Sequence, residues 1–335
     1  MNLESAHTPV AADEVAADEV DAYERLARRP WPTTPIRSDI DVSFEFFPPA
    51  TSAGSVALAR CVDQLAPLGP KFVSVTYGAG GTTQDTTHTA VTDLASIPGL
   101  SVAGHLTCVD STATKVAEVI DNYLAVGVHH IVALRGDTPS TIATGTPTAS
   151  RGGYTTAVEL VAAIRRHAEA RDTDIEISVA AYPEVHPKAA SAASDLDNLK
   201  AKIDAGATRA ITQFFFDADV FLRFLDTVHE AGIDVPIVPG IMPVTNFAGV
   251  TRFAARCQTT VPDWMHDLFA DLDDMPDVQP LVAATVAAEQ CRRLAEHGVR
   301  EFHFYTMNRA ELTAATCRIL GVRPVIQRHS AVKAS

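Results

Sequence analysis

Short apolar runs recur along most of the chain, and each is followed by a polar turn and then by a stretch of helical periodicity. The runs are hydrophobic almost throughout, which is typical of parallel strands that are buried on both faces. Most of them start roughly thirty residues apart, the size of one βα unit. From Ile40 onward the pattern predicts eight strands, namely Val42–Phe47, Phe72–Thr76, Ser101–Thr107, His130–Arg135, Glu176–Ala181, Arg209–Phe214, Pro236–Gly240 and Glu301–Tyr305.

Between these runs the apolar positions recur at helical spacing. The last predicted helix is followed by Gly298, a residue type that is common just past a helix end. The segment from Asn246 to Arg300 is long enough for more than one helix, including Asp263–Asp271, and is interpreted as an insertion before the last strand. The other predicted helices are Val56–Leu65, Thr114–Val126, Thr156–Ala170, Leu196–Asp204, Val220–Ala231 and Leu281–His297.

Eight buried strands that alternate with helices predict a (β/α)8 TIM barrel, a single domain over residues 39–325. A doubly wound open sheet is the alternative. That fold would place a Gly-x-Gly-x-x-Gly turn after an early strand, and the sequence has no such motif. The barrel is therefore the favoured prediction.

The two ends of the chain do not share the repeat. Residues 1–38 contain Ala-Ala-Asp-Glu-Val twice in succession and then three prolines, and we interpret them as an N-terminal arm. A mobile arm is favoured over an amphipathic docking helix because the apolar stripe of Val15, Tyr23 and Leu26 is thin. Residues 326–335 are interpreted as a C-terminal tail.

The charge of the chain narrows the choice of partners. With 27 basic and 41 acidic residues the formal net charge is −14, which argues against nucleic acid or an anionic membrane as a partner. The five cysteines form no Cys-x-x-Cys pair, so we expect reduced thiols and a cytoplasmic location. No window approaches the eighteen or so consecutive apolar residues of a membrane-spanning helix.

The candidate chemistry lies at the strand ends, because the active site of such a barrel is built at the carboxyl edge of its strands. Glu45 lies among Phe44, Phe46 and Phe47 on the first strand. Removal from water disfavours the charged form of a carboxyl group, so a glutamate in these surroundings can act as a general acid. A structural glutamate paired with an arginine is the alternative.

The next three strand ends also carry polar groups. Thr76 precedes the glycine-rich run 78–81, whose backbone amides can converge on an anion or form an ordinary turn. His105 follows on the third strand, where a histidine is more often a core residue than a ligand. The run Arg135-Gly136-Asp137 can hold a phosphate with the arginine and tune a ring system with the aspartate, or form a mutual salt bridge.

The loop after the fifth strand offers an aromatic ring at Tyr182 and an imidazole at His186. The helix that follows carries Asp195, Asn198 and Lys202 at spacings of three and four, so the three side chains share one face. From the spacing alone, a solvated polar face is the simpler interpretation.

The last strands add an amide, an aromatic wall and a cation. Gln213 precedes three phenylalanines at 214–216, and Tyr305 and Arg309 lie at or just past the end of the eighth strand. Metal and nucleophile motifs such as His-Glu-x-x-His and Gly-x-Ser-x-Gly are absent from the sequence. Lys71 lies at the start of a strand, the stability face, which argues against a Schiff-base aldolase.

Taken in order, eight segments resemble the short bacterial type of the methylenetetrahydrofolate reductase family. The likeness covers about residues 40 to 325, and the ordered set is specific where any single segment would be weak. The segments are S-F-E-F-F-P-P (43–49), V-T-Y-G-A (75–79), H-L-T-C (105–108), A-L-R-G-D (133–137), A-A-Y-P-E-V-H-P (180–187), I-T-Q-F-F-F-D (211–217), P-G-I-M-P-V (239–244) and F-H-F-Y-T-M-N-R-A-E (302–311).

The resemblance implies an FAD-containing barrel that reduces 5,10-methylenetetrahydrofolate to 5-methyltetrahydrofolate by ping-pong hydride transfer from NADH or NADPH through the flavin. Such an enzyme serves one-carbon metabolism and methionine synthesis. The resemblance also implies a cytoplasmic homo-oligomer. A C-terminal regulatory domain that binds S-adenosylmethionine, as in the eukaryotic type, is not expected.

Carried over position by position, the resemblance implies that Glu45 is the general acid that helps open the methylene bridge to an iminium and contacts the substrate. Asp137 would lie beside the flavin pyrimidine edge, where its charge disfavours an anionic reduced flavin. The positions that match the FAD site are Thr76, His105, Arg135, Gly136, Asp137, Tyr182, His186, Asp195, Asn198 and Lys202. The positions that match the face shared by nicotinamide and folate are Gln213, Phe253, Tyr305, Met307 and Arg309.

One departure bears on the substrate. Gly249 occupies a position where the family can place a glutamine that contacts folate, so this part of folate recognition is weaker or is supplied elsewhere. Two other functions stay open: a barrel that binds folate or flavin without turnover, and a barrel that transfers hydride directly from a nicotinamide.

Overall fold

The computed structural model describes residues 39–77, 84–109, 111–136 and 152–325. The predicted N-terminal arm, the predicted C-terminal tail, the glycine-rich run 78–81 and Asp137 lie outside the described residues. Arg135 and Gly136 are the last described residues before one of these gaps.

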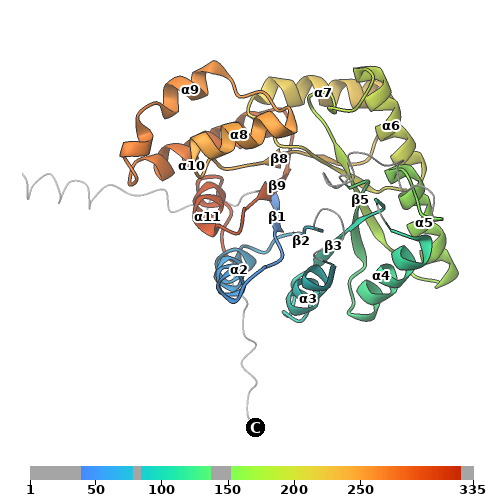
Figure 1. Cartoon of the computed structure of the whole chain (residues 1–335). Helices are drawn as coiled ribbons and strands as arrows, with labels where there is room; N and C mark the ends of the chain where they lie inside the picture. The colour runs from blue at the N-terminus through green and yellow to red at the C-terminus, as the bar shows by residue number, and fades with distance from the viewer. Residues whose placement is uncertain (1–38, 78–83, 110, 137–151, 326–335) are drawn as a thin grey trace, which may run out of the picture. The chain divides into compact units, whose positions relative to one another are not determined.

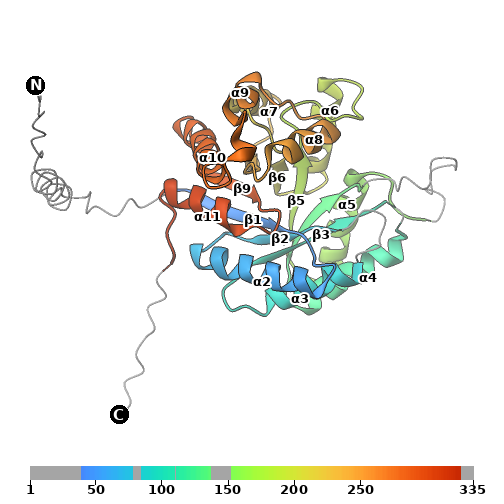
Figure 2. The ribbon, with the colours of Figure 1, turned by 60° about the vertical axis from the view of Figure 1, so that its left-hand side comes forward.

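Parallel strands form the centre of the fold (Figures 1 and 2). The strands are β1 (Asp41–Phe46), β2 (Val73–Val75), β3 (Val102–Thr107), β4 (His130–Leu134), β5 (Glu176–Ala181), β6 (Arg209–Thr212), β7 (Ile237–Val238), β8 (Gly240–Ile241) and β9 (Glu301–Tyr305). Along the sheet the order is β7, β6, β5, β4, β3, β2, β1, β9 and β8, with every pairing parallel. Because only Pro239 separates β7 from β8, the two ends of this order adjoin, and the predicted (β/α)8 barrel is confirmed.

The predicted seventh strand, Pro236–Gly240, is wrong as a continuous strand. It is two short strands: Ile237 pairs with Ala210 of β6, and Gly240 pairs with His303 of β9. Pro239 lies between them, and a proline has no amide hydrogen to continue a ladder. Because of this break, the segment pairs with β6 through β7 and with β9 through β8, and it thereby joins the two ends of the sheet.

Helices surround the barrel, and the seven that the sequence analysis predicts, Asp263–Asp271 among them, are confirmed. Three more, α3, α8 and α11, were not named by the prediction; α3 is rich in threonine, which is a weak helix former. The helices are α2 (Ser52–Leu65), α3 (Gln84–Ala95), α4 (Ala113–Ala125), α5 (Ala157–Ala170), α6 (Ala192–Asp204), α7 (Ala218–Glu230), α8 (Phe247–Cys257), α9 (Asp263–Phe269), α10 (Gln279–Glu296) and α11 (Ala310–Ile319), with 3-10 turns η1 (Ala66–Leu68) and η5 (Leu272–Asp274). As expected, the stretch before the last strand holds several helices, α8 to α10 (Figure 1).

Side-chain caps fix where the two helices beside the site begin. Ser191 caps α6: its hydroxyl accepts from the Ser194 amide, and the Ser194 hydroxyl accepts in turn from the Ser191 amide. Asn246 caps α8 by accepting from the Gly249 amide at 2.6 Å. Such caps satisfy amides that have no partner within the helix, so they set the first residue of the helix. Side chains later in each helix are therefore held in a fixed rotational phase.

An ion-pair network covers the amino-terminal face of the barrel. Lys71 pairs with Asp41 at 3.0 Å and with Glu301, and Arg209 pairs with Glu176. These residues come from five different strand starts, so the network ties the strands together at the end opposite the polar strand ends. Lys71 thus lies on the stability face, as the sequence predicted.

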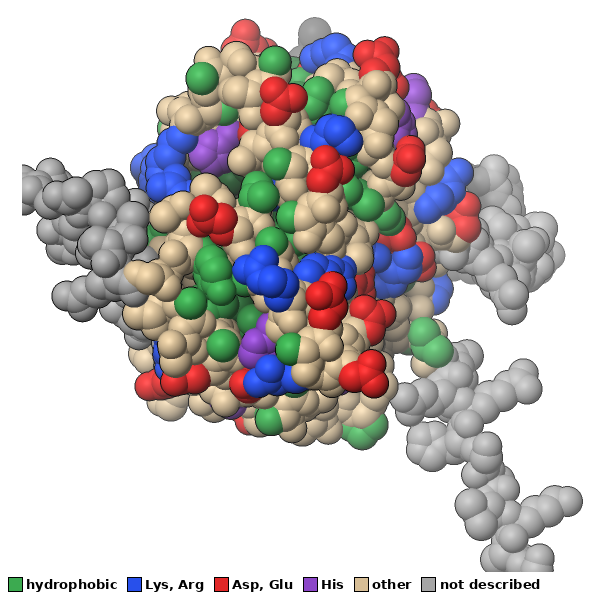
Figure 3. All heavy atoms as spheres, turned by 90° about the vertical axis from the view of Figure 1, so that its right-hand side faces the viewer, with side chains coloured by type: hydrophobic (Ala, Val, Ile, Leu, Met, Phe, Trp, Pro, Cys, Tyr) green, Lys and Arg blue, Asp and Glu red, His purple; other side chains and the backbone are tan. Residues whose placement is uncertain are grey.

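The distribution of charge on the surface and the state of the cysteines agree with what the net charge and the cysteine spacing predict. On the face shown in Figure 3, acidic and basic side chains are interspersed, without a broad basic area. None of the five cysteines, all of which lie in the described residues, forms a disulfide. Among the described residues no helix is long and apolar enough to cross a membrane.

The close packing of β3 against α4 predicts a large effect of one methyl group. A Cβ atom at Gly104 would lie 2.4 Å from Cζ of Tyr123, whose hydroxyl donates to the His105 carbonyl oxygen at 2.9 Å. We expect Gly104→Ala to lower the free energy of unfolding by about 1–3 kcal/mol, measured by denaturant titration. In a Tyr123→Leu background the same change should cost less, because the clashing ring is gone. Equal costs in both backgrounds would contradict this packing.

Candidate active site

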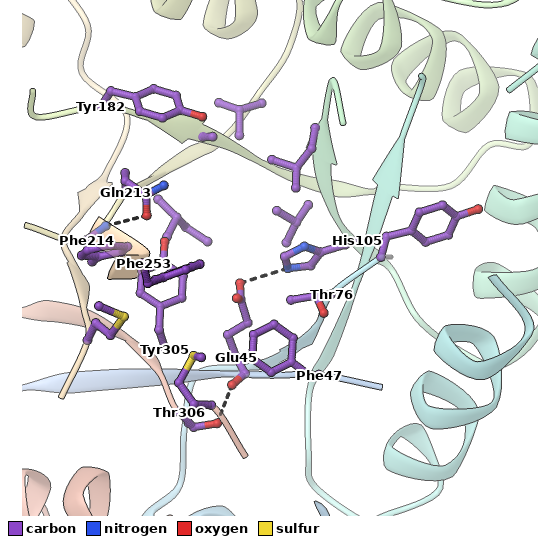
Figure 4. A pocket seen from close by; sticks show the side chains of 18 residues that line it. Glu45, Phe47, Thr76, His105, Tyr182, Gln213, Phe214, Phe253, Tyr305 and Thr306 are labelled. Atoms are coloured by element: carbon purple, nitrogen blue, oxygen red, sulfur yellow. Dashed lines mark hydrogen bonds and ion pairs between the residues drawn. The ribbon is translucent and has the colours of Figure 1, made fainter. Parts of the chain in front are cut away.

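A pocket of about 310 Å³ opens at the carboxyl edge of the barrel (Figure 4). Residues from strands on opposite sides of the barrel meet there, as expected for this fold. Glu45 lies between two groups of side chains in Figure 4, with His105 and Thr76 on one side and Gln213 and the aromatic rings on the other. The sequence-predicted residues that line it are Glu45, Thr76, His105, Tyr182, Gln213, Phe253, Tyr305 and Met307.

Glu45 is the only carboxylate among the described residues that line this pocket. Its side chain is 15% exposed, and Oε2 lies 3.4 Å from Nε2 of His105 and 3.7 Å from Nε2 of His303. The arginine partner that the sequence left open is not found for Glu45 in the described part of the chain. The titratable groups nearest to Glu45 are two imidazoles. Because an imidazole can be neutral, the Glu45 carboxylate has no permanent counterion among the described residues.

His303 is a residue that the sequence prediction missed. It is fully buried, and its Nδ1 lies 2.8 Å from Oγ of Ser43, so Nε2 faces Glu45. Strand alternation could have identified His303 and Ser43, because alternate residues on a strand face the same side. Ser43 shares its side with Glu45 on one strand, and His303 shares its side with Tyr305 on the neighbouring strand. A serine hydroxyl on Nδ1 fixes the ring orientation, and if it donates there the proton of a neutral ring lies on Nε2.

His105 is held in its neutral form. Burial lowers the pKa of His105, with Glu45 acting in the opposite direction and His303 lowering the pKa further. Its Nε2 makes no well-aligned hydrogen bond among the described residues, although Oε2 of Glu45 lies 3.4 Å away. A neutral imidazole at this position can form a hydrogen bond with the Glu45 carboxyl group without supplying a positive charge to it.

The opposite wall is aromatic and rigid. Phe214 and Phe253 stack with ring centroids 5.4 Å apart, and the Tyr305 hydroxyl donates to the Thr212 carbonyl oxygen at 2.7 Å. Burial, and secondarily the Glu45 charge, raises the pKa of Tyr305 well above its ordinary value, so it stays neutral. Gly240 passes so close to this wall that a Cβ there would lie 2.5 Å from the Tyr305 ring. Flat aromatic ligands fit against such a wall.

The loop after β9 is fastened to the loop after β1. The Asn308 side chain accepts from the Phe47 amide and donates to the Phe47 carbonyl oxygen, both at 2.9 Å. Met307 and Asn308 have φ values of 53° and 54°, a region that costs energy for residues other than glycine. Asn308 is a second residue that the prediction missed; it supports Met307 and does not line the pocket.

A second cavity of about 550 Å³ adjoins the first, with Tyr182 and Leu134 common to both. Six further sequence-predicted residues line it: Arg135, Gly136, His186, Asp195, Asn198 and Lys202. The prediction that one face of α6 presents Asp195, Asn198 and Lys202 together is confirmed, and the face looks into this cavity. Arg309 is exposed and lines neither cavity.

Lys202 supplies a buried cation to the second cavity. Its Nζ donates to the Ala180 carbonyl oxygen at 2.6 Å, and burial lowers the pKa of Lys202 to about 8 against the opposing effect of Asp195. Asp195 also accepts from the His186 amide at 2.9 Å, which orders the loop after β5. Lys202 and the exposed Arg135 give this cavity local positive charge in an acidic protein.

Together, the fold and the paired cavities define an α/β barrel with a candidate active site at its strand ends. The methylenetetrahydrofolate reductase family model matches residues 33–321. The 5,10-methylenetetrahydrofolate reductases of Pectobacterium carotovorum subsp. carotovorum and Escherichia coli (strain K12) are both 47% identical to this chain, over 88% and 86% of it and 94% and 93% of their own lengths. The chain belongs to the methylenetetrahydrofolate reductase family, whose members are oxidoreductases.

The fold also has a solved counterpart. An uncharacterized protein from Clostridium thermocellum that binds two copies of 5-methyl-5,6,7,8-tetrahydrofolic acid has a TM-score of 0.53 to this structure, with 13% identity. The match covers 85% of this chain and 95% of that one. At this identity the likeness concerns the fold alone.

Burial of Lys202 predicts a pH-dependent stability. Its pKa in the folded protein, about 8, lies below its ordinary value of 10.5, so the unfolded chain binds more protons between these values and stability rises with pH there. Below pH 8 the buried charge therefore destabilises the ligand-free fold. We expect Lys202→Met to raise the free energy of unfolding at pH 7 by about 1–2 kcal/mol. This gain is smaller than the pKa shift alone would give, because the substitution also removes the hydrogen bond to the Ala180 carbonyl oxygen.

The measurement is the melting temperature of both proteins, freed of small molecules, from pH 7 to pH 10. The advantage of Lys202→Met should shrink as the pH rises above 8. Lys200→Met, at an exposed position on the same helix, is the control and should show no such trend. A difference that is independent of pH would contradict the assignment.

Proposed function

We propose that the protein reduces 5,10-methylenetetrahydrofolate to 5-methyltetrahydrofolate with NADH or NADPH as electron donor and FAD as cofactor. The observation that carries the proposal is Glu45, a lone carboxyl group beside two buried histidines and facing an aromatic wall. Membership of the methylenetetrahydrofolate reductase family supports the substrate.

The second cavity suits FAD in chemistry. Lys202 is a buried cation whose Nζ donates to the Ala180 carbonyl oxygen, and its charge is compensated when an anion such as a pyrophosphate lies beside it. Arg135 would be the second cation. Tyr182, His186, Asp195 and Asn198 would contact the rest of the cofactor, and Thr76 and His105 in the first pocket would hold its ring system. When bound, FAD supplies a two-electron carrier between the nicotinamide and the folate.

Glu45 would act as the acid. Opening of the methylene bridge breaks a carbon–nitrogen bond, and the departing amine nitrogen takes a proton, which the Glu45 carboxyl group donates. The net reaction takes one hydride from NAD(P)H and one proton from solvent, so Glu45 must be protonated again before the next cycle. His105 and His303, both beside Oε2, are placed to hydrogen-bond the carboxylate form in the meantime.

The aromatic wall would hold the two substrates in turn. Gln213, Phe253, Tyr305 and Met307 would contact the nicotinamide in one half-reaction and the folate in the other, as a ping-pong sequence requires. Arg309, at the start of α11, would reach the exposed end of the bound molecule. Asp137, next to Gly136 in the sequence, would set the charge near the cofactor ring.

The proposal predicts a coloured protein. The freshly purified protein should show a flavin absorption spectrum that bleaches when NADH is added without oxygen and returns when methylenetetrahydrofolate follows. Both half-reactions are thereby tested in one cuvette. A protein that stays colourless after incubation with FAD would instead favour direct hydride transfer or binding without turnover.

Glu45→Gln separates the acid from the rest of the site. The amide keeps the size of the side chain but has no proton to donate, so we expect methyltetrahydrofolate formation to fall about 10²- to 10⁴-fold. Reduction of the bound flavin by NADH should persist, because that half-reaction needs no acid. Glu118→Gln, an exposed glutamate on α4, is the matched control. Unchanged folate reduction in Glu45→Gln would remove Glu45 from the mechanism.

A further inference from the structure

A third cavity, of about 330 Å³, lies along α8 beside the first pocket. We call it the α8 pocket. It shares Met242, Phe253 and Met307 with the first pocket, so the two spaces have a common wall and a ligand in one can extend into the other.

The helix presents two cations to the α8 pocket. Arg252 and Arg256 both line the pocket, and both residues are exposed. In the described chain neither guanidinium lies within 4.0 Å of a carboxylate. Two like charges four residues apart on a helix repel each other slightly, although Arg256, in the last turn of α8, is also favourably placed at the carboxyl end of the helix. In a protein of net charge −14, such a pair makes a local site for anions.

Gly249 makes room on the same face. It lines the α8 pocket one turn before Arg252 and Phe253, and it adds no side chain to the space. A Cβ there would lie 2.9 Å from Oδ1 of Asn246, the atom that caps α8. A side chain at this position would therefore crowd the cap as well as fill part of the pocket.

The geometry points to a dicarboxylate as the ligand. We propose that Arg252 and Arg256 bind the carboxylates of the glutamyl tail of the folate substrate, an inference that rests on the proposed function. Residues four apart rise about 6 Å along a helix, and a terminal glutamate carries two carboxylates several bonds apart. Each guanidinium can pair with one carboxylate through two parallel hydrogen bonds. Further glutamyl units add further carboxylates within reach of the same pair.

The phosphate of a nicotinamide donor offers related chemistry but a poorer match. A phosphate group concentrates its charge on one centre, which a single guanidinium fork satisfies, whereas the α8 pocket offers two cations one helical turn apart. The folate, with its aromatic rings on the Phe253 side of the shared wall, would place its charged tail toward the arginines.

The test compares substrates and variants in the holoenzyme. Arg252→Gln, Arg256→Gln and the double variant are assayed with methylenetetrahydrofolate carrying one or three glutamyl residues, and with NADH and NADPH. We expect each single change to raise KM for the folate about threefold to fivefold, with kcat and both nicotinamide KM values unchanged. The loss should be larger for the triglutamate and should shrink at high salt, which screens exposed charges.

Binding is measured separately from turnover, by calorimetric titration of 5-methyltetrahydrofolate with one or three glutamyl residues. The same loss of affinity is expected there. Arg166→Gln, an exposed arginine on α5, is the control and should match the unmodified protein in every measurement.

Three outcomes would overturn the proposal. If the KM for NADPH rises and that for folate does not, the arginines bind the donor phosphate. If no KM or affinity changes, the α8 pocket binds neither substrate. If affinity falls equally for both folate lengths and at every salt concentration, the arginines act on the helix and not on the tail. Absence of turnover in the unmodified protein would instead reject the proposed function itself.

Discussion

The pairing of β1 with β9 is the contact on which the site depends. Its register places Ser43 beside His303 and Glu45 beside Tyr305, so the two strands that join the start and end of the barrel also supply the proposed acid and its neighbours. A slip of one residue would turn these side chains out of the barrel, because successive residues on a strand face opposite sides. Closure and chemistry are thus fixed by the same hydrogen-bond ladder, which the Lys71 ion pairs at the opposite end reinforce.

Polar groups inside a barrel have to be compensated locally. The histidines near Glu45 meet this constraint in different ways: His303 through the Ser43 hydroxyl, and His105 by remaining neutral as burial lowers its pKa. A permanent cation such as arginine would hold Glu45 ionised throughout a catalytic cycle. Neutral imidazoles leave the carboxyl group free to change its protonation state, which an acid must do.

Three cavities share walls around this centre, and helices supply the charges in two of them. The polar face of α6 gives the second cavity its buried cation, Lys202, and α8 gives the α8 pocket Arg252 and Arg256. Each helix begins at a side-chain cap, which sets the rotational phase of every residue that follows. The buried cation of the second cavity and both cations of the α8 pocket therefore lie on capped helices that turn them inward or along the pocket.

The sequence by itself determined the barrel, the polar strand ends with Glu45 among them and the shared face of α6, because period and residue type are local properties. Only the tertiary structure decided which side chains meet. His303 and Asn308 escaped prediction because their partners, Ser43 and Phe47, lie about 260 residues away in the chain. The division of the seventh strand likewise depends on two neighbours that no local pattern identifies. Spatial neighbours of this kind arise from barrel closure, which is a property of the whole chain.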